Sequence, residues 1–231
     1  MSSLISSLKQ SYLGKLAKKV LKGKPRSTGF AGSSAYWEKR YAKNSNSGAG
    51  SYGRLANFKA EVLNDFVSNN NIQTVIEYGV GDGNQLSLAK YPYYVGFDVS
   101  KTAIELCRSR FKDDHTKEFY LTDNKEHLND KAQLTLSLDV LYHLVEDEVF
   151  DAYMKRLFDT ATAFVIIYSS NFDDHFAPHV RSRKFTDWVD QNVSEQWKLK
   201  TFIENIYPFD EANPDHTSMA DFYVYSKMNP N

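Results

Sequence analysis

The stretch Val75–Asn84, V-I-E-Y-G-V-G-D-G-N, decides the fold class of this chain of 231 residues. A short β-type run, Thr74–Tyr78, leads directly into three glycines that are spaced two residues apart. This arrangement is typical of the first strand-to-helix turn of an open parallel sheet, where a ligand touches the backbone and the following helix offers free N–H groups. We therefore expect a ligand site at this turn.

Strand-like and helix-like segments alternate on both sides of the turn. The β-type runs are Thr74–Tyr78, Tyr93–Val99, Glu118–Leu121, Leu134–Leu138, Ala163–Ser169 and Phe222–Tyr225. Helical patterns cover Leu55–Phe66, Gln85–Lys90, Thr102–Phe111 (with Ser100 as its N-cap), Asp147–Thr160 and Phe185–Val193. Residues 197–213 fit either an edge strand with a turn or a cover over a substrate pocket. The order predicts βαβ units, and hence an α/β fold with a doubly wound, mostly parallel sheet.

The composition narrows the class of protein and its compartment. Hydrophobic residues make up 42% and charged residues 25%, as in ordinary globular proteins. The single cysteine, Cys107, excludes an intramolecular disulfide and a cysteine-rich zinc site. A reducing, cytoplasmic environment is therefore expected. No apolar run approaches the roughly 18 residues that predict a membrane span.

The net charge of −1 conceals a split between two parts of the chain. Residues 1–37 hold seven Lys and Arg and no acid, which leaves 21 basic against 29 acidic residues, or −8, in the remainder. Residues 1–22 show the pattern of a basic amphipathic helix, and Gly23–Ser34 has the composition of a linker. We interpret residues 1–34 as a leader that packs on its own domain, docks on a partner protein, or lies peripherally on the inner membrane face. The acidic remainder disfavours nucleic acid as a partner.

Two acidic residues near the turn indicate the kind of ligand. Asp98 follows Gly79 by nineteen residues, at the end of the next strand, where a carboxylate can accept both hydroxyls of a ribose. Glu77 precedes Gly79 by two residues and would repel a pyrophosphate, whereas it suits an ammonium group. The glycines also read G-x-G-x-G rather than the G-x-G-x-x-G of dinucleotide sites. These features favour S-adenosylmethionine, which has a ribose and a cationic amino-acid tail but no phosphate.

The segments E-Y-G-V-G-D-G (77–83) and G-F-D-V-S (96–100) resemble motif I and its successor in class I S-adenosylmethionine-dependent methyltransferases. The resemblance runs from about Trp37 to Tyr225. It implies a Rossmann-like, seven-stranded methyltransferase fold over residues 35–231, with an N-terminal helical extension and with residues 35–70 as lid elements. The cofactor residues that it implies, together with those expected on chemical grounds, are Trp37, Tyr41, Arg54, Glu77, Gly79, Gly81, Asp82, Gly83, Asp98, Val99, Asp123, Leu138 and Asp139.

The assignment of Arg54 rests on a chemical argument, and that of Asp123 is implied by the resemblance. A guanidinium binds a carboxylate in a bidentate fork, so Arg54 is expected to hold the methionine carboxylate of the cofactor, although it also fits the cap of a surface helix. Asp123 follows the third strand and would lie near the adenine amine, or would be a turn aspartate.

The segment S-L-D-V-L-Y-H-L-V-E-D (137–147) resembles the family's motif IV, beside the transferable methyl group. The resemblance implies that Asp139 and Leu138 line the cofactor and that Tyr142 and His143 face the acceptor. His143 is a candidate general base, because a neutral imidazole can take a hydroxyl proton; a packing role is the alternative. Asp139 is the second candidate catalytic residue. His175, His179 and Arg181, after the fifth strand, are expected to bind the acceptor.

The upstream segments Y-W-E-K-R-Y (36–41) and S-G-A-G-S-Y-G-R-L-A-N-F-K (47–59) resemble a subgroup of bacterial methyltransferases associated with surface glycans. That resemblance implies O-methylation of a sugar or another small hydroxylated acceptor in glycan biosynthesis. No metal is expected, because Ser170 stands where metal-dependent relatives have an acid. A nicotinamide-dependent oxidoreductase and a noncatalytic, cofactor-binding scaffold subunit remain as alternatives.

Overall fold

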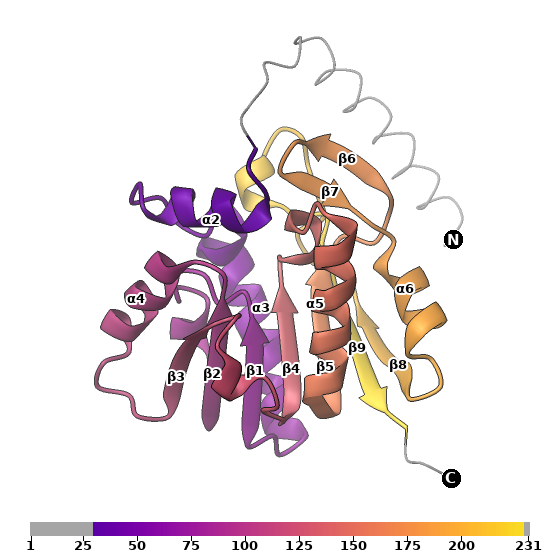
Figure 1. Cartoon of the computed structure of the whole chain (residues 1–231). Coiled ribbons are helices and arrows are strands. Elements are labelled where there is room, and N and C mark those ends of the chain that lie inside the picture. Colours follow the sequence, from indigo (N-terminus) through magenta and orange to yellow (C-terminus); the bar gives the residue numbers. More distant parts are fainter. Residues whose placement is uncertain (1–29, 229–231) are drawn as a thin grey trace.

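The computed structural model describes residues 30–228, so residues 1–22 and most of the expected linker lie outside it. Within the described residues the core is a seven-stranded sheet with the order β3-β2-β1-β4-β5-β9-β8 (Figure 1). Strands β1 to β5 pair in parallel, and β9 runs antiparallel between β5 and β8. The bounds are Thr74–Tyr78 (β1), Tyr93–Asp98 (β2), Lys117–Leu121 (β3), Ala132–Leu138 (β4), Ala161–Ser169 (β5), Trp197–Ile203 (β8) and Asp221–Lys227 (β9). The predicted doubly wound, mostly parallel, seven-stranded fold is confirmed.

Four helices cover the two faces of the sheet. Helices α3 (Gly53–Asn69) and α4 (Lys101–Arg110) pack on one face, and α5 (Asp147–Thr160) and α6 (Phe185–Asn192) pack on the other. Each contributes an apolar stripe to its core, and the central strands are buried on both sides, as parallel strands require. The expected N-cap of α4 is present, since Ser100 Oγ accepts from the Ala103 N–H at 3.1 Å.

Two connections lack the helix that the fold class leads one to expect. The predicted helix Gln85–Lys90 is wrong, because the chain there forms only the 3₁₀ turn η2 (Leu86–Leu88). The Ser87 hydroxyl bonds back to the Asn84 carbonyl, and Pro92 follows too soon for a longer helix. Between β3 and β4 the chain has only the turn η3 (Lys125–His127).

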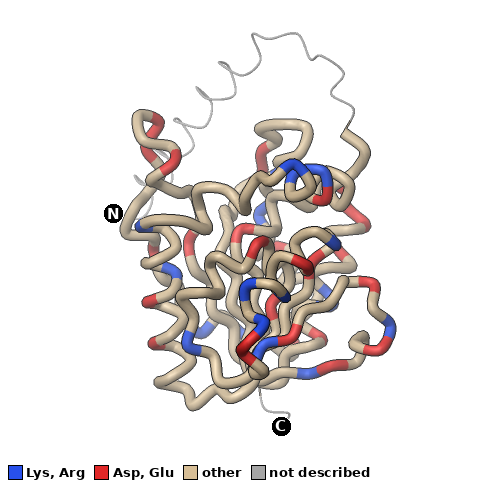
Figure 2. Tube along the Cα trace, turned by 90° about the vertical axis from the view of Figure 1, so that its left-hand side faces the viewer, with Lys and Arg blue, Asp and Glu red and all other residues tan. Residues whose placement is uncertain are grey.

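Additional elements lie above the carboxyl ends of the parallel strands (Figure 1). Helix α2 (Ser33–Tyr41) and the turn η1 (Ala49–Ser51) precede the core, and the expected linker therefore ends inside α2. The hairpin of β6 (Asp174–Ala177) and β7 (Val180–Ser182) follows β5. Acidic and basic residues are interspersed over the described chain (Figure 2). Among residues 30–228, none of the helices has the length and apolar character that a bilayer crossing requires.

Candidate active site

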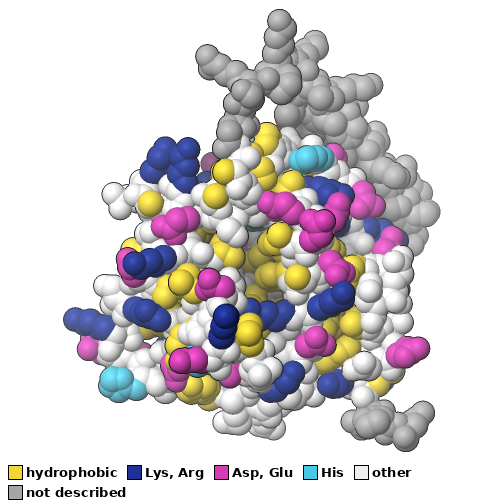
Figure 3. Space-filling model, viewed as in Figure 1, with side chains coloured by type: hydrophobic (Ala, Val, Ile, Leu, Met, Phe, Trp, Pro, Cys, Tyr) yellow, Lys and Arg dark blue, Asp and Glu magenta, His cyan; other side chains and the backbone are white. Residues whose placement is uncertain are grey.

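The ends of β1, β2 and β4 open into a cavity of about 260 Å³ beneath α2. In the view of Figure 1, the space-filling surface has a hollow whose interior is largely hydrophobic (Figure 3). This is the edge at which ligands bind in open α/β sheets. Ten of the residues expected from the sequence line the cavity: Trp37, Tyr41, Glu77, Gly79, Gly81, Asp98, Val99, Leu138, Asp139 and His143.

The glycine turn leaves no room for a side chain at Gly79 or Gly81. Gly79 and Gly81 have φ angles of 88° and 61°, in the left-handed region that glycine tolerates. A Cβ on Gly79 would lie 2.4 Å from Val140 Cγ2, and one on Gly81 would lie 2.4 Å from Ser47 Oγ. The loop after β4 and the loop after α2 therefore both close on this turn. Gly83 instead packs α4 against the turn and does not line the cavity.

The cavity wall holds two buried carboxyl groups. Asp98 accepts hydrogen bonds from the N–H groups of Gly81 and Ser100, both at 2.9 Å, and burial raises its pKa to about 6. Glu77 accepts from the Tyr94 hydroxyl at 2.8 Å, and burial raises its pKa to about 7. Low dielectric disfavours these charges when no cation is bound. The wall is therefore suited to a ligand with positive charge.

The cation that reaches this wall is Lys59, which sequence reasoning missed. Its side chain is only 1% exposed, and Nζ forms an ion pair with Asp139 Oδ2 at 2.5 Å. Lys59 lies four residues from both Leu55 and Leu63, on the apolar face of α3, and a lysine on that stripe was the available signal. Arg54 does not enter the cavity: its Nε donates to the His216 carbonyl at 2.5 Å, and its guanidinium lies 4.3 Å from the Tyr207 ring centre.

Asp139 occupies a constrained position directly after β4. It is a non-glycine residue with a φ of 60°, which is uncommon and often marks functional sites. Besides Lys59, its carboxylate accepts from the Tyr142 hydroxyl at 2.8 Å. Tyr142 does not line the cavity itself and therefore acts on Asp139 from behind.

His143 lies in the turn η4 (Leu141–His143), where its ring centre is 4.8 Å from that of Trp37 and the two ring planes are at 80°. Burial lowers its pKa to about 4, so the ring is neutral at pH 7. Its Nδ1 is 3.3 Å from the His179 carbonyl. Because a carbonyl can only accept, Nδ1 carries the proton, and Nε2 keeps a free lone pair.

Several residues expected at the site lie outside the cavity. Asp123 is exposed, and its neighbour Thr122 lines the cavity instead. His175 is exposed on β6, and His179 stacks on Tyr36 at 4.4 Å. Arg181 pairs with Asp147 at 2.9 Å and donates to the Val145 carbonyl at 3.1 Å.

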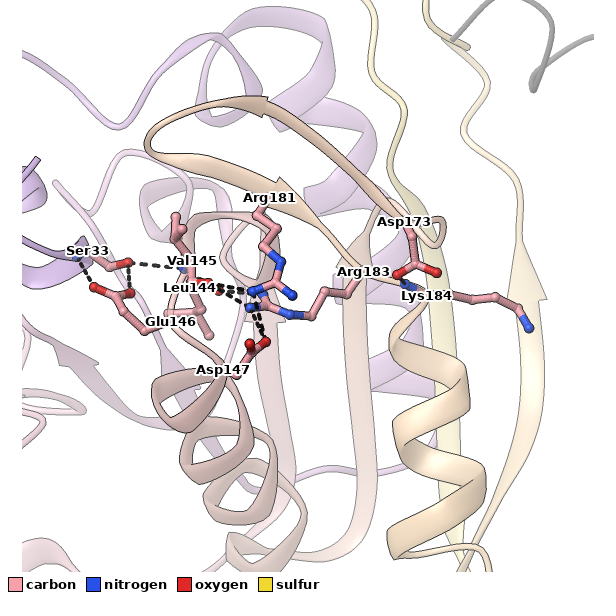
Figure 4. Close-up of polar contacts among 9 residues, drawn as sticks. All are labelled: Ser33, Leu144, Val145, Glu146, Asp147, Asp173, Arg181, Arg183 and Lys184. Atoms are coloured by element: carbon pink, nitrogen blue, oxygen red, sulfur yellow. Dashed lines mark hydrogen bonds and ion pairs between the residues drawn. The ribbon is translucent and has the colours of Figure 1, made fainter. Parts of the chain in front are cut away.

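The loop after β4 is held from both sides, as Figure 4 shows. Arg181 and Arg183 from β7 converge on Asp147. From the other side, the Ser33 N–H and hydroxyl donate to Glu146 at 3.0 and 2.6 Å, which fixes the first turn of α2. The arginines thus position the loop that carries Asp139 and His143.

Two further acids fasten the segments that precede β1 to the rest of the fold. Glu38 on α2 accepts from the hydroxyls of Ser100 and Thr102, at 2.7 and 2.6 Å. Asp82 accepts from the Ser47 N–H at 2.9 Å and from the Tyr52 hydroxyl at 2.7 Å. Asp82 therefore ties the segment that holds Ser47 and Tyr52 to the glycine turn and does not line the cavity.

Comparison by sequence finds no match, either to a described protein family or to a curated protein. Comparison by structure finds proteins of similar fold. The N-methyltransferase NodS from Bradyrhizobium japonicum WM9, in complex with S-adenosyl-L-homocysteine, has a TM-score of 0.65 and 14% identity over 87% of this chain and 100% of its own. Magnesium protoporphyrin IX methyltransferase from Synechocystis PCC 6803, also with S-adenosylhomocysteine, has a TM-score of 0.59 and 14% identity over 86% and 96%. The methyltransferase domain of bacterial CtHen1 has a TM-score of 0.57 and 18% identity over 73% and 96%. The chain thus has the Rossmann-like fold that these methyltransferases share.

Proposed function

We propose that this protein is an S-adenosylmethionine-dependent methyltransferase that methylates a hydroxyl group of a sugar or another small acceptor. The observation that carries the proposal is the pair of buried carboxyl groups, Glu77 and Asp98, beside a glycine turn inside one cavity. Buried acids oppose a pyrophosphate and favour a ligand that combines a ribose with a positively charged tail.

The cavity residues fit this cofactor. Gln85 is buried, and its Oε1 has no hydrogen-bond partner within the described chain, while its Nε2 is held by the Ala56 carbonyl. An orphaned buried acceptor indicates a missing donor. Gln85 and Glu77 would accept from the ammonium group, and Lys59 would hold the carboxylate in place of Arg54. Asp98 would accept from the ribose hydroxyls, and Val99 would flank the adenine.

The cofactor supplies an electrophilic methyl group, and the chain's own residues supply alignment and a base. Methyl transfer depends chiefly on holding the two reactants in line. His143 is neutral at pH 7, and its Nε2 can accept the proton of the attacking hydroxyl. Asp139 holds Lys59 and Tyr142 in place, and Trp37 and Tyr41 in α2 cover the cavity against water.

Charge and the sequences of residues 36–41 and 47–59 support the proposed acceptor class. Because Arg181 and Arg183 are already paired with Asp147 and with backbone carbonyls, a neutral hydroxylated acceptor is favoured over an anionic one. The similarity of residues 36–41 and 47–59 to glycan-associated methyltransferases supports a sugar. The basic pattern of residues 1–22 supports a cytoplasmic protein that docks peripherally on the inner membrane face.

Calorimetry with S-adenosylmethionine, S-adenosylhomocysteine and NAD tests the cofactor. Binding of the first two without NAD is expected, and NAD binding alone would refute the proposal. Transfer of a labelled methyl group into neutral glycan acceptors tests the reaction. His143→Ala should lower the rate about 10²- to 10⁴-fold, whereas the control His115→Ala, at an exposed position, should not. Cofactor binding without transfer to any acceptor would favour a scaffold subunit.

A further inference from the structure

The cavity extends beyond the glycine turn, along the face of α5. Val149, Ala152, Tyr153 and Arg156, all on α5, line it together with Thr122, which follows β3. The space is open because the β3–β4 connection contains only η3 and no helix that would cover the neighbouring strands. This part of the cavity has no role in the reaction proposed above.

Arg156, which lines this extension, has one buried donor without a partner among the described residues. Its Nε donates to the Tyr78 hydroxyl at 3.2 Å, and its Nη1 donates to the Thr122 carbonyl. Its guanidinium carbon lies 5.0 Å from the ring centres of both Tyr78 and Phe97. These contacts fix the plane of the group. The remaining nitrogen, Nη2, is buried and has no partner among residues 30–228.

The position of Arg156 relative to Asp98 identifies the part of a nucleoside that it faces. The Thr122 N–H donates to the Asp98 carbonyl at 3.0 Å, and the Thr122 carbonyl accepts from Arg156. Thr122 thus links Arg156 to the backbone of Asp98, whose carboxylate would hold the ribose. Val99 is next to Asp98 in the chain and lines the same cavity. A base attached to that ribose would therefore lie within the extension that Arg156 and Val99 share.

We propose that the Nη2 group of Arg156 donates a hydrogen bond to a ring nitrogen of the adenine base and so determines base specificity. The inference rests on the proposed function. A guanidinium can only donate, and the adenine ring nitrogens N1, N3 and N7 can only accept. The acid expected to bind the exocyclic amine, Asp123, is exposed and outside the cavity. The base is thus recognised by a donor from α5.

Binding of deaza analogues to the wild-type protein tests this directly. In calorimetry, S-adenosylhomocysteine is compared with its 1-deaza, 3-deaza and 7-deaza analogues, each of which replaces one ring nitrogen by C–H. One of the three should bind about 10- to 100-fold more weakly, as expected for a hydrogen bond to a charged donor. Equal binding of all four ligands would overturn the inference and leave the proposed function intact. Failure to bind S-adenosylhomocysteine at all would overturn both.

Variants identify the donor. Arg156→Lys keeps a cation near the aromatic rings but loses the planar fork, so the penalty of the sensitive analogue should disappear. The control is Arg108→Lys, because Arg108 likewise donates to a backbone carbonyl, that of Phe119 at 2.6 Å, but lies outside the cavity. It should retain the full penalty. A penalty that persists unchanged in folded Arg156→Lys would refute the assignment, and the wild-type series decides the matter if that variant does not fold.

Discussion

The buried ion pair of Lys59 and Asp139 should be strongly coupled, and a double-mutant cycle can measure this. Lys59→Met removes the cation and keeps a flexible apolar stem of similar length. Asp139→Asn removes the anion, tolerates the φ of 60° and still accepts from Tyr142. Both variants therefore isolate the charge with little change in shape.

The magnitude follows from burial. Lys59 is 1% and Asp139 14% exposed, and their charged atoms are 2.5 Å apart. Removing one partner of such a pair leaves an uncompensated charge and costs about 3–5 kcal/mol, whereas replacing both partners is often close to neutral. We expect Lys59→Met to lower the free energy of unfolding by about 3–5 kcal/mol. In the double variant most of this loss should return, with a coupling energy of at least about 2 kcal/mol.

Equilibrium unfolding in urea, with the four proteins compared at one pH, measures the cycle. The matched control is Lys101 and Glu105, an exposed pair on α4 whose charged atoms are 3.7 Å apart. That pair should show a coupling of about 0.3–0.5 kcal/mol. If the two single losses at Lys59 and Asp139 simply add in the double variant, the pair is not coupled and does not stabilise the fold as its burial predicts.

Three further predictions concern the turn, the buried acids and the lid. Gly81→Ala and the control Gly53→Ala both place a side chain at a positive φ, at a backbone cost of about 1–2 kcal/mol, but only the new Cβ at Gly81 would meet Ser47. Only Gly81→Ala should therefore weaken S-adenosylhomocysteine binding, by at least about tenfold, and equal binding by the two variants would contradict the role of the glycine turn. Because the pKa of Glu77 is raised to about 7, the folded state binds more protons than the unfolded state, and the contribution of Glu77 to stability falls as pH rises from about 4.5 to 7. The difference in unfolding free energy between wild type and Glu77→Gln should show this slope. Cofactor binding should release a proton near pH 7. Glu146→Ala should speed hydrogen exchange in residues 33–41, because it removes the acceptor of the two Ser33 hydrogen bonds, whereas Glu148→Ala at an exposed position should not. Identical exchange in the two variants would show that the Ser33–Glu146 contact does not stabilise α2.

The fold and the centre of the site were readable from local pattern. A strand that ends in glycines, a second strand that ends in Asp98, and Ser100 as a helix cap each depend on neighbours within a few residues. The mostly parallel arrangement of the strands then followed from the alternation of strands and helices. The helix predicted at 85–90 failed because a side-chain bond and Pro92 shortened it.

Which basic side chains reach the cavity depends on the tertiary structure. The sequence predicted Arg54 as the cation of the site and missed Lys59, because only the packing of α3 brings Arg54 to His216 and Lys59 to Asp139. Arg181 was expected to bind the acceptor, but the position of β7 places it in an ion pair with Asp147. The sequence by itself determined the class of fold, the glycine turn and the acids around it, since these are local. Which distant side chains pair, and which donor stays unpaired, depends on long-range contacts that no local pattern encodes.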